Sequence, residues 1–329
     1  MNIPLNILCQ SPVSENMTPA QAMRNTVDLA KHADALGYHR FWVAEHHSDQ
    51  ALASGAPEVL VAHIASVTER IRVGSGGVLL PYYSPFKVAE QFNALAALFP
   101  DRIDLGLGRS GGSEGHAPSA LGVRSSGPAA FAAIDELLSW LGPGSAKRPY
   151  PSTFASPQID ESAQPWILGT SPASATFAAK RGLAYAFGGF LDPRGMMPAL
   201  AAYHQNFTPG RSGAGPRVNI AWNVCVGETE SEANHLAKTM QHWFVRTMMR
   251  RENPRFQPPE AADPSQYSPS ERMMVQMMRQ IAFVGSAEQV LDQIEALTKQ
   301  TSANEVTLVT IPYAHQARVA SYTQLMAAA

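Results

Sequence analysis

The chain has little cysteine, no excess of either charge and no long apolar run, and each of these absences excludes a class of protein. Cys9 and Cys225 are the only cysteines among 329 residues, so neither a disulfide framework nor a cysteine-based zinc site is expected. The 25 Lys and Arg residues nearly balance the 27 Asp and Glu residues. This balance, without a basic cluster, argues against a nucleic-acid partner.

The sequence also lacks a basic segment followed by an apolar stretch at its start, and no run approaches the roughly 20 apolar residues that a bilayer-spanning helix needs. We therefore expect a cytoplasmic protein without membrane contact, whose partners are small molecules. Hydrophobic residues make up 45% of the chain and charged residues 16%. This composition can bury a large core, and residues 1–329 are expected to form a single domain.

Short β-rich segments alternate with longer helical patterns along most of the chain. Strands are expected at 3–8, 40–44, 71–77, 102–108, 165–169, 183–189, 218–227 and 305–311. Helices are expected at 18–36, after Pro57, and at 85–98, 128–141, 172–181, 193–206, from about 231, and at 287–297. Eight strands with intervening helices favour a closed (β/α)8 TIM barrel over an open doubly wound sheet, with insertions after the fourth and seventh strands.

Four unusual motifs follow four consecutive predicted strands. They read AEHHS at 44–48, GSGG at 74–77, GLGRSGG at 106–112 and GTSP at 169–172. In a (β/α)8 barrel the carboxyl ends of the strands meet at one face, which carries the active site. We therefore expect these four motifs to converge around one hollow.

His46 is the candidate catalytic residue of the first motif. Strand alternation places Trp42, Ala44 and His46 on one face and Glu45 and His47 on the other. The small Ala44 side chain leaves room for a ligand beside His46, whose imidazole is expected to titrate near neutrality and to relay protons. Two alternatives remain: the imidazoles satisfy local backbone groups, or the Glu-His-His run binds a metal. The metal site is disfavoured because adjacent strand residues diverge.

The glycine-rich motifs are interpreted as places where a ligand approaches the main chain. Glycine at the end of a buried strand, as at Gly76 and Gly77, often marks such a contact, although a simple turn is the alternative. GLGRSG at 106–111 matches a dinucleotide-binding pattern, but no helical pattern opens at its third glycine. Arg109 is better explained as an anion ligand, with a surface arginine in a flexible loop as the alternative.

Three hydroxyl side chains gather at the start of the helix that begins at Pro172. These are Thr170, Ser171 and Ser174. A helix N-terminus offers free N–H groups and a favourable dipole for phosphate, whereas ordinary capping explains Ser171 alone. Together with Arg109 at the preceding strand end, the hydroxyls indicate a phosphate site.

Seven of the 13 methionines lie between Met240 and Met278, around a proline-rich loop. Methionine fills irregular apolar gaps and tolerates repacking. The segment is interpreted either as a mobile lid over an apolar substrate or as a loosely packed surface insertion.

The motifs in their order resemble the bacterial luciferase-like flavin-dependent monooxygenase family, in the branch of single-type chains. The resemblance rests on YHRFWVAEHHSD, RVGSGGVLLPYYSPFKVAEQFNALAALFPDRIDLGLGRSGG, ILGTSPASATFAAKRGL and FVGSAEQVLDQI, and it is densest over residues 38–112. It implies a TIM barrel that uses reduced FMN, or in some relatives a deazaflavin, as a dissociable cosubstrate. It also implies a separate flavin reductase and a homodimer formed through LVAHIASV and FNALAALF, the helices after strands two and three.

The resemblance assigns roles to individual residues. His46 matches the histidine that family members place where reduced flavin meets oxygen. Gly76 and Gly77 match a pair joined by a cis peptide against the flavin ring, where light-emitting relatives carry alanines. The residues that match the phosphate side are Arg109, Thr170, Ser171 and Ser174. The implied reaction is the oxygenation of a small, mostly apolar organic substrate with reduced FMN and O2. The alternatives are a non-catalytic flavin-binding or storage protein and a deazaflavin-dependent dehydrogenase.

Overall fold

Eight parallel strands close into a barrel. The computed structural model describes residues 3–109, 116–142, 149–210 and 214–329. The barrel strands are β1 (Leu5–Cys9), β2 (Arg40–Val43), β3 (Arg72–Leu79), β4 (Ile103–Gly108), β5 (Gln164–Gly169), β6 (Ala184–Gly188), β7 (Val218–Val226) and β9 (Glu305–Val309). Each strand from β1 to β7 pairs with the next, and β9 closes the ring between β7 and β1. The predicted TIM barrel is confirmed.

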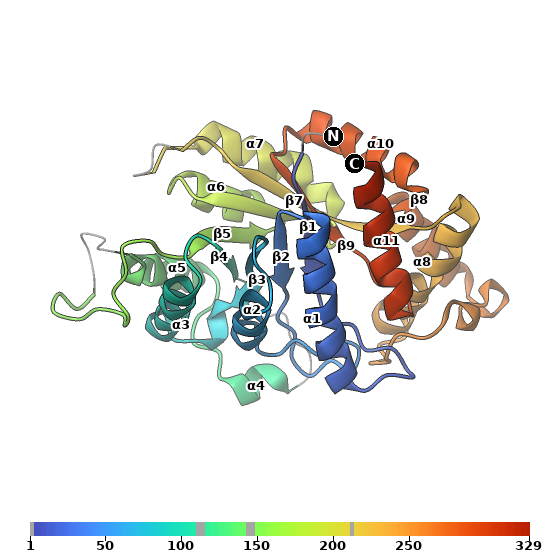
Figure 1. Ribbon diagram of the computed structural model, residues 1–329, viewed down its shortest axis with the longest axis horizontal. Helices are drawn as coiled ribbons and strands as arrows, with labels where there is room; N and C mark the ends of the chain where they lie inside the picture. Colours follow the sequence, from blue (N-terminus) through green and yellow to red (C-terminus); the bar gives the residue numbers. More distant parts are fainter. Residues whose placement is uncertain (1–2, 110–115, 143–148, 211–213) are drawn as a thin grey trace.

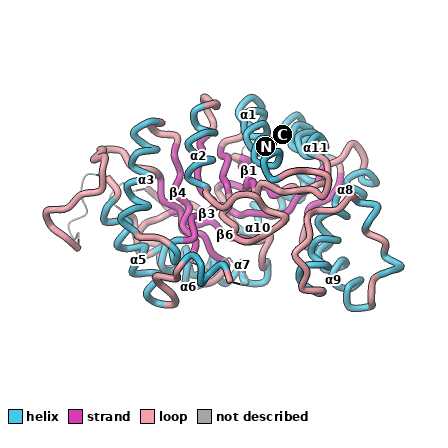
Figure 2. Tube along the Cα trace, turned by 90° about the horizontal axis from the view of Figure 1, so that it is seen from below, coloured by secondary structure: helices cyan, strands magenta, loops and turns pink. Residues whose placement is uncertain are grey.

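The helices lie outside the barrel (Figures 1 and 2). They are α1 (Pro19–Leu36), α2 (Pro57–Ser66), α3 (Pro85–Leu98), α4 (Ala117–Leu121), α5 (Pro128–Trp140), α6 (Pro172–Ala179), α7 (Met196–Asn206), α8 (Glu230–Phe244), α9 (Pro269–Gln280), α10 (Ala287–Thr301) and α11 (His315–Ala328). Figure 1 shows α1 and α11 side by side, with the two chain ends close together. Local sequence sets the limits of α1, because Thr18 and Gln21 form a capping box and Gly37 ends the helix at φ 86°.

The chain carries more than one helix after β4 and after β7. The chain between β4 and β5 carries α4 and α5, and the chain between β7 and β9 carries α8, α9, β8 (Phe283–Gly285) and α10. The sequence did not predict β8, which pairs with the far end of β7 rather than joining the barrel. Three residues are too few to show strand alternation. Helix α11 was also missed, because its buried face includes the polar residues Arg318 and Ser321.

The inward and outward faces of the strands separate as the alternation predicts. Trp42 and Ala44 belong to the cluster inside the barrel, together with Leu8. Phe41 and Val43 pack into the larger cluster between the strands and the helices. The β2 exit therefore delivers its even-numbered side chains to the barrel interior.

A charged network fills the opposite end of the barrel, where the strands begin. The Arg40 guanidinium is fully buried and donates to Asp104 Oδ2 at 2.6 Å and to Glu305 Oε2 at 2.7 Å. Arg72 reaches Asp104 at 2.7 Å, and Arg217 reaches Glu305 at 2.6 Å. This network ties β2, β4 and β9 together at the face that serves stability in barrels of this kind.

Helices α2 and α3, which the resemblance places in a dimer interface, direct most of their apolar side chains inward. Leu60, Ile64 and Phe92 are buried in the core of their own barrel. Val59 and Leu98 remain 59% and 70% exposed. Dimer formation through these helices therefore stays a prediction. Within the described ranges, no helix has the length and apolar content needed to cross a bilayer.

Candidate functional site

Two adjoining hollows lie toward the carboxyl ends of the barrel strands. The first, here called the barrel-mouth hollow, measures about 480 Å³, and its walls include Trp42, Gly76 and Thr170. The second, called the histidine hollow, measures about 950 Å³, and its walls include His46 and Trp243. They meet at two shared side chains, Phe190 and Leu191.

The structure brings some of the predicted site residues together and places others behind the hollows. Gly76 and Thr170 line the barrel-mouth hollow, and His46 lines the adjoining one. Thus the exits of β2, β3 and β5 contribute to one continuous region. The remaining predicted residues line neither hollow; they are Gly77, Arg109, Ser171 and Ser174.

The glycine pair forms an irregularity in β3. The pairing register of β3 with β4 shifts between Ser75 and Val78, and the Gly76–Gly77 peptide is cis. A Cβ atom on Gly76 would lie 2.8 Å from Leu8 Cδ1, and one on Gly77 would lie 2.7 Å from the Gly106 carbonyl oxygen. A side chain at either position would force its neighbours to shift, and Gly76 presents its main chain at the barrel-mouth hollow.

His46 stands just beyond the end of β2, where its backbone N–H donates to the Ser54 carbonyl at 2.9 Å. Burial, aided by the charge of His47, lowers the pKa of His46 to about 4. The expectation that this imidazole titrates near neutrality is therefore wrong, since it is neutral across the physiological range. Its Nδ1 atom is buried and has no hydrogen-bond partner among the described residues.

The Glu45 side chain joins the chain after β2 to the end of β3 through hydrogen bonds. Its buried carboxylate accepts hydrogen bonds from the Leu79 backbone N–H at 2.8 Å, the Tyr83 hydroxyl at 2.7 Å and His47 Nε2 at 2.6 Å. Sequence reasoning considered Glu45 only as a metal ligand and missed this role. The part of the chain that is described holds no group of three His, Cys, Asp or Glu side chains placed for a metal.

The start of α6 is held by its own hydroxyl groups. Ser171 Oγ accepts from the Ser174 backbone N–H at 3.3 Å, which is N-cap geometry. Ser174 Oγ is buried, donates to the Ser171 carbonyl at 2.8 Å and lies 3.3 Å from the Tyr185 hydroxyl. The Ser174 hydroxyl therefore makes its hydrogen bonds to groups within the protein. We revise its predicted role from direct contact to positioning of the helix start.

Arg109 lies near the same helix start. Its guanidinium stacks on the Phe131 ring at 4.5 Å, and its Nε is buried without a partner in the described ranges. Burial raises the pKa of Tyr185 to about 12, against the opposing effects of the Ser174 hydrogen bond and the nearby Arg109 charge. A cation with an unpaired N–H beside a helix N-terminus fits a phosphate group. Ser110 and Gly111 of the GLGRSG motif lie outside the described residues.

A sequence model of the luciferase-like monooxygenase family matches residues 3–305. The chain belongs to the luciferase-like monooxygenase family. An Escherichia coli (strain K12) protein named luciferase-like monooxygenase is 35% identical over 326 residues, covering 98% of this chain and 96% of the relative. A Bacillus subtilis (strain 168) protein named N-acetyl-S-alkylcysteine monooxygenase is 38% identical over 239 residues, 70% of each chain. The solved structure of apo-MsnO8 is 36% identical, with a TM-score of 0.88 over 99% of this chain and 97% of that one.

In this member of the family, the methionine-rich segment forms one wall of the histidine hollow. A π-helical turn, Val245–Met249, extends α8 and contributes Thr247 and Met248 to the lining. The following loop is anchored, because Phe256 is fully buried and its N–H donates to the Val13 carbonyl at 3.1 Å. Asn253 also donates to the Ser48 carbonyl at 3.0 Å, beside the histidine pair. These contacts anchor the loop at Phe256 and Asn253, and both interpretations of the methionine-rich segment stay predictions.

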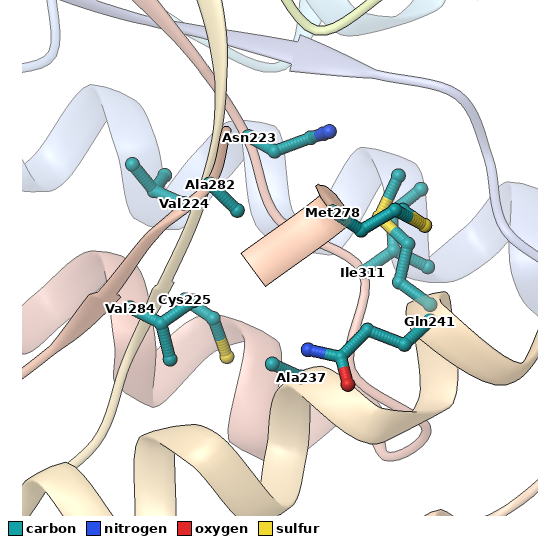
Figure 3. Close-up of a pocket in the computed structure, with 10 residues that line it drawn as sticks. Asn223, Val224, Cys225, Ala237, Gln241, Met278, Ala282, Val284 and Ile311 are labelled. Atoms are coloured by element: carbon teal, nitrogen blue, oxygen red, sulfur yellow. The ribbon is translucent and has the colours of Figure 1, made fainter. Parts of the chain in front are cut away.

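A third and smaller cavity of about 380 Å³ lies where β7 and β8 meet α8 and α9 (Figure 3). Cys225 lines one side, Gln241 comes from α8 and Met278 from α9. Met240 contributes to this cavity and to the histidine hollow. Burial raises the pKa of Cys225 to about 12, so its thiol is neutral and a poor nucleophile.

Proposed function

We propose that this protein is a flavin-dependent monooxygenase that uses reduced FMN and O2 to oxygenate a small, mostly apolar organic substrate. One oxygen atom goes to the substrate, the other leaves as water, and FMN is released oxidised. The observation that carries the proposal is the position of His46, a neutral imidazole with an unpaired Nδ1, in a hollow that adjoins the one lined by Gly76 and Thr170.

Reduced FMN would supply the electrons that activate O2. The protein would bind the flavin, orient it and shield it from water. We assign the main chain of Gly76 and Gly77 to the support of the ring. Arg109, Thr170 and Ser171 are assigned to the phosphate, with Ser174 positioning Ser171. His46 accepts or donates a proton at Nδ1.

The apolar part of the histidine hollow supports a substrate with an apolar portion, while the rest of its wall is polar and includes Gln10, Ser48 and Glu252. Leu52, Met240 and Trp243 line the apolar part, and the bulk of these side chains keeps water away from the imidazole. The relative named N-acetyl-S-alkylcysteine monooxygenase suggests alkyl thioethers as the first substrate class to test. We further propose a cytoplasmic homodimer formed through α2 and α3 and served by a separate flavin reductase.

The proposal is tested by supplying reduced FMN from an NADH-dependent flavin reductase under ¹⁸O2, with N-acetyl-S-butylcysteine as the first of a panel of thioethers, aldehydes and ketones. We expect one ¹⁸O atom in the product and correspondingly less hydrogen peroxide than the reductase alone produces, because each reduced FMN consumes one O2 in either case. Recovery of all consumed oxygen as hydrogen peroxide, with every panel member unchanged, would favour a flavin-storage protein. Substrate oxidation with a deazaflavin and without oxygen would favour the dehydrogenase.

A further inference from the structure

The side-chain amide of Asn219 on β7 lies inside the barrel, and one of its two polar atoms has no hydrogen-bond partner among the described residues. Asn219 is fully buried, and the Thr307 hydroxyl donates to its Oδ1 at 3.0 Å. Its Nδ2 is shielded from water and has no partner among the described residues. Turning the amide around would leave Oδ1 unpaired instead. Because Thr307 is the one hydrogen-bond partner that the described residues supply, one polar end lacks a partner in either orientation.

An unpaired buried amide is uncommon in folded proteins because it destabilises the fold, so its presence needs an explanation. The surroundings of Asn219 provide one. Asn219 forms part of the wall of the barrel-mouth hollow, next to side chains that are largely apolar, such as Leu8, Trp42 and Ala221. A hollow with mostly apolar walls and a few placed polar groups, here Asn219, Thr170 and Thr307, is typical of a small-molecule site.

We propose that Asn219 determines specificity by donating its free N–H to a carbonyl-type acceptor on the molecule that fills the barrel-mouth hollow. The inference rests on the proposed function and deepens it. Two molecules present such an acceptor: the ring of reduced flavin, through its carbonyl groups, and an acylated substrate. A site built around one buried donor discriminates against analogues that lack the acceptor, since the donor is then left unpaired.

The same strand offers a matched control. Asn223 lies four residues further along β7 and therefore on the same face. It is 5% exposed, and its Oδ1 is also buried without a partner in the part of the chain described. Asn223, however, lines the third cavity and not the barrel-mouth hollow. Leucine is similar in size to asparagine and has no polar group to satisfy.

The experiment compares Asn219→Leu and Asn223→Leu with the wild type in three measurements. These are the urea midpoint without ligand, the anaerobic Kd for reduced FMN, and the KM for N-acetyl-S-butylcysteine measured by formation of the oxygenated product. Asn223→Leu is expected to match or exceed the wild-type urea midpoint, whereas Asn219→Leu is expected to lower it modestly, because the buried Thr307 hydroxyl loses its acceptor. Asn219→Leu is expected to raise either the Kd or the KM about tenfold, the value of one hydrogen bond. Asn223→Leu is expected to change neither.

The parameter that changes identifies the ligand. A raised Kd for reduced FMN points to the flavin carbonyl, and a raised KM with an unchanged Kd points to the substrate. The inference is overturned if Asn219→Leu keeps both wild-type values or if Asn223→Leu weakens binding equally. A wild type that neither binds reduced FMN nor consumes the thioether would refute the proposed function, and the inference with it.

Discussion

Replacement of His46 by alanine is expected to lower kcat about 10²- to 10⁴-fold, the usual contribution of a positioned acid or base, with little change in the Kd for reduced FMN. The imidazole lies at the wall of the histidine hollow with Nδ1 unpaired, and it supports none of the residues assigned to the flavin. Single-turnover formation of the oxygenated product and an anaerobic flavin titration separate the two effects.

The pH profile adds a readout for His46. Its pKa is lowered to about 4, so the neutral imidazole predominates above that pH and is lost only as the pH falls toward it. The wild-type rate should therefore show no His46 titration near neutrality. His204→Ala, which changes an exposed histidine on α7, serves as the control. Two results would contradict the account. One is an unchanged rate in His46→Ala, and the other is a wild-type titration near pH 6.5 that the His46→Ala substitution removes.

Replacement of Arg40 by alanine is expected to destabilise the fold by about 3–5 kcal/mol, because removing one partner from a buried ion pair leaves charge uncompensated. Arg40 is the link between Asp104 and Glu305, the two buried carboxylates of the network. This loss is a large fraction of the roughly 5–15 kcal/mol that stabilises most native proteins. Equilibrium urea unfolding measures it. Arg194→Ala, at an exposed ion pair with Asp192, should leave the urea midpoint unchanged.

Acid unfolding distinguishes a lost ion pair from lost packing. Burial by itself raises the pKa of Glu305, but the hydrogen bond and charge of Arg40, with the charge of Arg217, lower it to about 2. A lowered folded-state pKa means that Glu305 contributes its full stability above its unfolded value of 4.5. That contribution disappears as the pH falls from 4.5 toward 2. Arg40→Ala should weaken this acid dependence; an unaltered dependence with an unchanged midpoint would refute the role of the network.

The sequence predicted the barrel because its signals were local and repeated. The capping residue Thr18 and the terminal Gly37 defined α1, and Pro85 marked the start of α3. The β8 strand and the α11 helix were not predictable in the same way. The first depends on pairing with a distant part of β7, and the second buries Arg318 against the Thr310 carbonyl and Cys9.

The sequence predicted that His46, Gly76 and Thr170 lie in one region, but it predicted neither the pKa of His46 nor the position of Arg109, Ser171 and Ser174 outside the linings of the two hollows. Strand alternation and the barrel rule located His46, Gly76 and Thr170. The pKa of His46 depends on burial beneath elements remote in sequence, which no local pattern reveals. Likewise, the pairing of Thr307 with Asn219 joins residues 88 positions apart and leaves the unpaired amide that the sequence does not show.

The central claim is that the exits of β2 to β5 form one flavin site with its phosphate end at α6. Anaerobic titration of the wild type and of Arg109→Met with reduced FMN and with reduced riboflavin tests it most directly. We expect the wild type to bind reduced FMN at least about tenfold more tightly than reduced riboflavin, since only FMN engages the cation and the helix start. Arg109→Met should abolish most of that difference. Equal binding of the two flavins by the wild type, or binding of neither, would contradict the account.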